Sequence, residues 1–348
     1  MATVIDWNLA ASVGVQLASS GPVVTPRQAR DVVSELREAA AAAVAPVAGA
    51  TGLACPPDTA DTLVVDRSEW IRSNVRGLES AVGPTLDRLA SQGGRSSRAV
   101  ASIGARATGV QLGAALAYMS GKVLGQFEAF RPPGTAPRLL LVAPNILLVE
   151  RSLGVDPADF RLWVALHEET HRVQFGAVPW LAHHLLGEVT ALLDLAEVRG
   201  DDVLARLVSG ARSVGAGGSL VEVLQSPEQR EVLNRLTAVM SLLEGHADHV
   251  MDVAAPALIP SLNDIRERFD HRRNSPNVIE GLVRRLLGLD AKLRQYSDGA
   301  AFVRATVAEA GMSGFNEVWR SPESLPTLAE IHDPSVWLRR TAEQRSFA

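Results

Sequence analysis

The segment from Asp156 to Gly176 constrains the fold more than any other part of the sequence, because it carries both a start and a stop signal for a helix. Asp156 is a favoured N-cap residue, Pro157 suits the first helical position, and Gly176 follows the last apolar residue. Most positions between them are apolar, so the pattern predicts a largely buried helix. The positions expected to form a narrow solvent-facing strip are Arg161, Ala165, Glu169 and Arg172.

This helix contains the motif H-E-x-x-H, from His167 to His171. Two histidines four residues apart project from one face of a helix and can bind one Zn²⁺ through their imidazole nitrogens. Glu168 is turned about 100° away, where it can reach a metal-bound water without binding the metal. The motif therefore predicts a zinc site with Glu168 as general base. The other interpretation is two core histidines satisfied by hydrogen bonds.

A catalytic zinc site needs a third protein ligand, and we expect it to be Glu244. Glu244 and Asp248 are four residues apart in an amphipathic segment, so they share one face of a helix. One carboxylate can then bind the metal, while Asp248 accepts a hydrogen bond from a ligand imidazole. The alternative third ligands are Glu188, His183, His184 and the remaining histidines.

Other side chains are candidates for stabilising the negative oxygen that forms during hydrolysis. They are His246, His249 and Tyr296. His246 points nearly opposite to Glu244 on an unbroken helix, and His249 lies to the side, so both are poorer metal ligands but possible hydrogen-bond donors. No spacing in the sequence selects one of the three.

The rest of the chain predicts a mainly α (α+β) fold with a small β element. Aromatic residues make up only 5% of the 348 residues, and Ala, Leu and Val supply most of the apolar character, which favours helices. The expected helices are Arg27–Ala45, ended by Pro46, then Arg98–Phe130, Pro179–Glu197 and Pro227–Val253. Frequent glycines in Arg98–Phe130 indicate close packing against another helix. We expect three regions, 1–130, 131–270 and 271–348, packed as one unit.

One segment has a strand-like pattern, from Arg138 to Val149. Because Pro144 cannot donate a ladder hydrogen bond, we expect Leu139–Val149 to be an edge strand beside the metal-binding helix, where an extended substrate docks. The alternative is that both sides of the strand are already covered. The glycine-rich segment Ser209–Ser219 reads as a surface linker, or else as an active-site lid.

Charge and cysteine content exclude several classes. The net charge of −5 argues against nucleic acid or an anionic membrane as a partner. The single cysteine, Cys55, excludes an internal disulfide and a cysteine-rich metal site. The sequence shows no targeting or membrane segment, so we expect a cytoplasmic protein.

The chain resembles a family over most of its length. The sequence matches that carry the resemblance are Val64–Arg67, Tyr118–Gly121, Leu139–Asn145, His167–Phe175, Glu244–Asp252 and Lys292–Trp337. They are similar to the bacterial Zincin_2 family of zinc-dependent metalloproteases and hydrolases, which is associated in name with deazaflavin-coenzyme biosynthesis. The resemblance implies a mostly helical zincin with His167, His171 and Glu244 as zinc ligands and Glu168 as base.

Together these features predict a zinc hydrolase, most simply a metallopeptidase acting on a peptide or small amide. Two other functions are compatible with these site residues. One is hydrolysis of a non-peptide amide or ester, and the other is a non-catalytic helical binding module with a structural zinc. Gln174 stands where the metzincin motif requires glycine, and a long insertion separates His171 from Glu244. Both features depart from the usual peptidase patterns.

Overall fold

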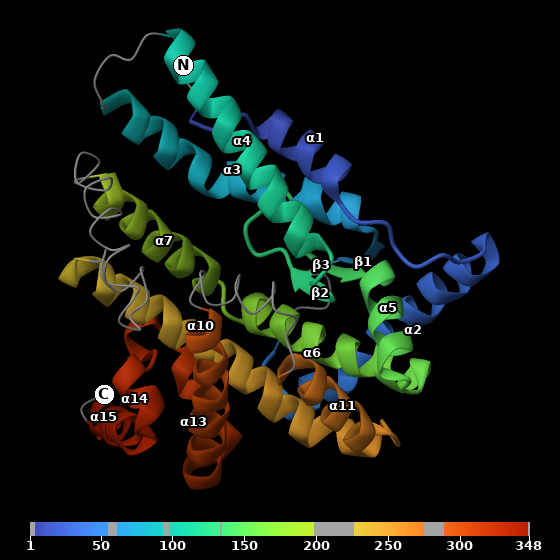
Figure 1. Ribbon diagram of the computed structural model, residues 1–348. Helices are drawn as coiled ribbons and strands as arrows, with labels where there is room; N and C mark the ends of the chain where they lie inside the picture. Colours follow the sequence, from blue (N-terminus) through green and yellow to red (C-terminus); the bar gives the residue numbers. More distant parts are fainter. Residues whose placement is uncertain are drawn as a thin grey trace. The chain divides into compact units, whose positions relative to one another are not determined.

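The computed structural model describes residues 4–54, 61–92, 98–132, 134–197, 226–274 and 289–346 (Figure 1). These residues form two compact units. The first consists of Met1–Ala177 with Val253–Arg266, and the second of Val178–Asp252 with Glu267–Ala348. The fold is mainly α with one small sheet, as the sequence predicts. Among the described helices, none is both long and apolar enough to cross a bilayer. The three regions expected from the sequence stay a prediction.

Three helices of the first unit lie side by side, α1 (Trp7–Leu17), α3 (Arg67–Gln92) and α4 (Arg98–Ser120) (Figure 1). The glycines of α4 allow α1 to approach its backbone. A Cβ at Gly109 would lie 2.6 Å from the carbonyl oxygen of Asp6, and one at Gly113 would lie 2.6 Å from that of Ala10. The expected close helix packing is therefore confirmed. The helix ends at Ser120, however, ten residues before the Phe130 expected from the sequence.

The sheet has three strands in the order β1-β3-β2. They are β1 (Asp61–Val65), β2 (Gly125–Phe127) and β3 (Arg138–Val142). β3 pairs in parallel with β1 and antiparallel with β2, so it is the central strand. The four residues from Leu139 to Val142 are fully buried. A continuous apolar run is typical of a strand covered on both faces.

The expectation of an edge strand over Leu139–Val149 is therefore wrong. The strand is central, and it ends at Val142. The following residues form α5 (Ala143–Leu153), with Pro144 in its first turn. A proline is tolerated there because the first N–H groups of a helix have no partner within the helix. The edge strands of the described sheet are β1 and β2, and the sequence pattern assigned helix to β2.

The long helix α2 (Pro26–Thr51) packs against α6 (Pro157–Ala177), which carries the H-E-x-x-H motif. Thr25 and Gln28 form a capping box at its start. Pro46 lies inside this helix, so the expected stop at Ala45 is wrong. Ala43 and Val47 on either side of the proline are fully buried. We attribute the tolerance of Pro46 to this packing.

The second unit is helical in its described residues. Its elements are α7 (Leu181–Glu197), α10 (Pro227–Ala254), α13 (Leu289–Phe315), η3 (Asn316–Trp319), η4 (Pro322–Ser324), α14 (Leu328–His332) and α15 (Pro334–Ser346). α10 is followed in the chain by η2 (Ala255–Ala257) and α11 (Leu262–Asn274). The predicted helices Pro179–Glu197 and Pro227–Val253 are confirmed to within two residues. The proposed linker or lid at Ser209–Ser219 lies outside the described residues.

Candidate metal centre

α6 begins and ends where its sequence predicts. The Asp156 carboxylate accepts a hydrogen bond from the backbone N–H of Asp159 at 3.0 Å, which is the expected N-cap. Pro157 is the first helical residue, and the helix ends at Ala177, one residue after Gly176. The H-E-x-x-H motif therefore lies well inside a regular helix, which fixes the relative positions of its side chains.

The two histidines of the motif point toward each other. The Nε2 atoms of His167 and His171 lie 3.2 Å apart, and their rings meet edge to face with centroids 4.9 Å apart. Both side chains are half-buried. Two imidazole nitrogens that converge in this way suit one shared cation, as the spacing predicts.

Gln174 holds the ring of His171. Its Oε1 lies 2.9 Å from Nδ1 of His171, and its side chain is fully buried. Because an amide oxygen only accepts hydrogen bonds, Nδ1 carries the proton and donates it to Gln174. Nε2 of His171 is thereby left with a lone pair for a metal ion. The sequence reasoning did not give this role to Gln174, although its position three residues after His171 on the same helix is a usable signal.

Glu168 projects toward the sheet rather than toward solvent. Only 8% of its surface is exposed, and its carboxyl group lies against Gly125 in β2. The strand and the helix also meet through Phe127 and Phe175, whose rings stack with centroids 5.4 Å apart. β2 therefore packs on the part of α6 that carries the motif.

The solvent-facing strip expected on α6 is not exposed. Arg161, Ala165, Glu169 and Arg172 are all buried. The charges are neutralised in ion pairs, since Nε of Arg172 donates to Glu169 at 2.7 Å and Arg161 binds Glu150. The charged residues on this face of α6 predicted a solvent-exposed strip. The strip is buried instead, because its charges are paired in salt bridges.

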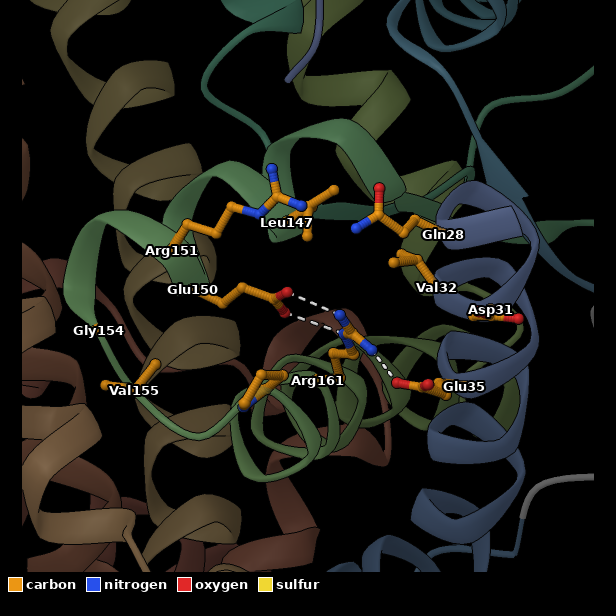
Figure 2. Close-up of a pocket in the computed structure, with 11 residues that line it drawn as sticks. Gln28, Asp31, Val32, Glu35, Leu147, Glu150, Arg151, Gly154, Val155 and Arg161 are labelled. Carbon is orange, nitrogen blue, oxygen red and sulfur yellow. Dashed lines mark hydrogen bonds and ion pairs between the residues drawn. The ribbon is translucent and has the colours of Figure 1, made fainter. Parts of the chain in front are cut away.

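Arg161 joins three helices. Its guanidinium donates two hydrogen bonds to the Glu150 carboxylate in α5, at 2.7 and 2.9 Å, and also binds Glu35 in α2 (Figure 2). Burial raises the pKa of Glu150, and Arg161 opposes this shift. A pocket of about 460 Å³ lies beside this cluster, and Gln28 and Arg151 also line it. The cluster fixes α6 against α2 and α5.

In the second unit, α10 carries four of the predicted site residues. Glu244 is half-buried, and Asp248 is exposed. His246 is fully buried and packs on Phe315 and Trp319, with ring centroids 5.1 and 5.6 Å away. These aromatic contacts indicate a packing role for His246.

His249 is half-buried on the same helix, and burial is the main factor that lowers its pKa. The negative charge of Asp252 raises this pKa and the positive charge of Arg304 lowers it, both to a smaller extent. A neutral imidazole at neutral pH can donate a hydrogen bond through one ring nitrogen. His249 can therefore donate a hydrogen bond to an oxyanion, as expected from the sequence.

The other candidates differ in their surroundings. The Glu188 carboxylate binds Arg235, with the closest contact at 2.8 Å, so this alternative ligand already has a cationic partner. His184 packs on Trp180, and His183 is exposed. Tyr296 lies in α13, but its side chain is outside the described part of the structure.

The comparisons with known proteins agree with this helix geometry. A family model described as zincin-like metallopeptidase matches residues 5–338. The chain belongs to the zincin-like metallopeptidase family. This zincin-like chain is also similar to the crystal structure of a “putative hydrolase with a novel fold” from Chloroflexus aurantiacus. The two have a TM-score of 0.70 and 31% identity, covering 97% of this chain and 99% of that chain. No curated protein matches it.

Membership of a zincin-like family implies a metal ion, typically zinc. The residues of this chain fit that ion. His167 and His171 offer imidazole nitrogens, and the contact of Nδ1 of His171 with Gln174 favours the tautomer that leaves Nε2 for a metal. Family and neighbour together support a zinc hydrolase in general.

Proposed function

We propose that this zincin-like protein hydrolyses peptide bonds, with His167, His171 and Glu244 holding one zinc ion. The observation that carries the proposal is the pair of converging imidazoles on one helix, with the Glu168 carboxylate one residue further along. A structural zinc site has no use for such a carboxylate, so its presence favours catalysis over a binding module. The substrate is then a peptide or a small amide in the cytoplasm.

Glu168 is the proposed general base. A zinc ion held by these residues would supply a Lewis acid, which would polarise the scissile carbonyl and lower the pKa of a water molecule. Glu168 accepts the proton of the attacking water and passes it to the leaving amine. His249 is the better candidate for donating to the developing oxyanion, because His246 is enclosed by aromatic rings.

The substrate backbone is proposed to pair with β2. Val142 N–H donates to Leu124 C=O, and Glu128 N–H donates to Arg138 C=O, so the residues on either side of β2 bond to the central strand. Since the ladder alternates, the backbone groups of Gly125 and Phe127 face away from β3, toward the side of β2 where no described strand pairs. The C=O of Phe127 already accepts from the N–H of Ala129, so Gly125 is the position proposed to pair. An extended peptide can add to such an edge. This moves the proposed docking strand from β3 to β2.

The variant Glu168→Gln tests the proposal. The amide keeps the shape of the side chain and cannot accept the proton, so zinc content and thermal stability should stay near wild type while hydrolysis is lost. Zinc content is measured on the purified protein, and activity with a peptide library. Glu267→Gln on an exposed turn of α11 is the matched control.

Two outcomes would contradict the proposal. Zinc-loaded wild type that cleaves no peptide but hydrolyses a simple amide or ester panel would replace the peptidase with a small-molecule hydrolase. Zinc-loaded wild type that hydrolyses neither panel would favour the binding module with a structural zinc.

A further inference from the structure

Gly125 lies against the carboxylate of the proposed base. A Cβ at this position would lie 2.5 Å from both Cγ and Cδ of Glu168 and 2.8 Å from its Oε1. Real Cβ atoms do not approach other atoms this closely, so any larger residue at position 125 must displace the Glu168 side chain. Because Glu168 is buried, it has little space in which to move without disturbing its neighbours.

The backbone conformation does not explain this glycine. The described glycines with positive φ are Gly52, Gly134, Gly154 and Gly311. Gly125 is not among them, and it pairs with Leu141 in a regular antiparallel ladder. Strand interiors disfavour glycine, which often marks a place where another group approaches the backbone closely. Here the approaching group is the Glu168 carboxylate.

We propose that Gly125 is a positioning residue for Glu168, which provides the space that holds the carboxylate between the edge strand and the metal-binding helix. This inference rests on the proposed catalytic role of Glu168. The same residue presents its N–H and C=O to the side of β2 that faces away from β3, where the described part of the chain has no further strand. A peptide that pairs with this edge at Gly125 therefore has its backbone next to the base. Gly125 therefore determines where the Glu168 carboxylate lies and how far it is from the backbone of a peptide paired with β2.

A double-mutant cycle on thermal unfolding tests the contact without an activity measurement. Gly125→Ala alone should lower Tm by at least about 2 °C, because the new methyl group overlaps Glu168. In a Glu168→Ala background, the same change should leave Tm unchanged or raise it, because the space is then empty and alanine suits a strand better than glycine. Equal shifts in the two backgrounds would overturn the inference.

Kinetics with a zinc-loaded protein and a fluorogenic peptide library test the positioning role. We expect Gly125→Ala to lower kcat by about 100-fold, with KM and zinc content near wild type, since a small displacement of a catalytic group has effects of this size. Gly125→Ala combined with Glu168→Gln should be no slower than Glu168→Gln alone. Gly104→Ala, where a Cβ meets nothing within 4 Å, is the control.

The outcomes separate this inference from the proposed function. An active wild type with no coupling between positions 125 and 168 overturns the positioning role and leaves the hydrolase intact. A coupled unfolding cycle in a wild type that cleaves no peptide, amide or ester overturns the proposed function, and with it the catalytic meaning of Gly125.

Discussion

The Nε2 atoms of His167 and His171 lie 3.2 Å apart, and the proton on the other ring nitrogen of His171 is held by Gln174. The two ring nitrogens converge on a common point, and Nε2 of His171 faces that point with a lone pair. The helix supplies the geometry through residue spacing, and the amide of Gln174 supplies the tautomer. Ligand orientation is thus built into α6 itself.

Zinc content of single variants should identify the ligands. We expect one zinc per chain in wild type, and loss of most of it in His167→Ala, His171→Ala and Glu244→Ala, because each removes one of the three proposed ligands. Glu188→Ala should keep its zinc, because that carboxylate binds Arg235 instead. Metal analysis after dialysis measures this. If Glu244→Ala kept its full zinc content while Glu188→Ala lost zinc, the assignment of Glu244 as third ligand would be wrong.

Gln174→Leu should weaken zinc binding by about 10- to 100-fold without removing a ligand, because the ring of His171 loses the partner that orients it. The sequence assigns a similar role to Asp248, for which Asp248→Asn is the test. Since Gln174 is fully buried and Asp248 is exposed, the Gln174 variant should lose more affinity. Competition with a chelator measures both. Equal affinity in wild type and Gln174→Leu would remove Gln174 from the site.

Arg161→Met should lower the free energy of unfolding by about 3–5 kcal/mol at neutral pH, because it leaves the buried Glu150 carboxylate without its cationic partner. The loss should be smaller at about pH 5 than at about pH 8. Burial already raises the pKa of Glu150, and removing Arg161 raises it further, so the folded variant takes up a proton as the pH falls and the buried charge disappears.

Urea unfolding at both pH values measures this effect. Arg27→Met is the control, because its pair with Asp31 is exposed and should contribute less than about 1 kcal/mol. A loss that is independent of pH would show that the variant acts through packing alone.

Gly299→Ala should destabilise the second unit strongly. A Cβ there would lie 1.9 Å from the carbonyl oxygen of Ser241, and one at Gly245 would lie 2.2 Å from the backbone of Gly299. These contacts are between backbones of α10 and α13, which cannot move aside as side chains do, so we expect a loss of about 1–3 kcal/mol or more. Gly187→Ala in α7 meets nothing within 4 Å and should instead be stabilising. Thermal unfolding of the two variants compares them directly.

The sequence predicts the elements that carry strong local signals. Asp156 and Pro157 define the start of α6 because capping is a local interaction, and the motif spacing places both histidines on one face. The apolar periodicity of α10 likewise gives its bounds to within one residue. These features depend on neighbours within a few positions in the chain.

The errors have tertiary causes. Arg161 is buried because it pairs with carboxylates of two other helices, Glu150 at a separation of 11 residues and Glu35 at 126. Arg172 is the exception, because its partner Glu169 lies on the same helix. Pro46 stays within α2, where buried side chains flank it. β2 is three residues long and starts with glycine, so no periodicity marks it. The space at Gly125 is defined only by Glu168 in another element.

The strand order also bears on how the first unit folds. β1 has its only described strand partner in β3, and two long helices, α3 and α4, lie between them in the chain. β2 and β3 are close in sequence and can pair early, whereas β1 must wait for the closure of a long loop. On a growing chain, the apolar side chains of β1 therefore stay without their sheet partner until β3 has been synthesised. α6 follows later still, so the pair of His167 and His171 is completed only on a nearly finished first unit.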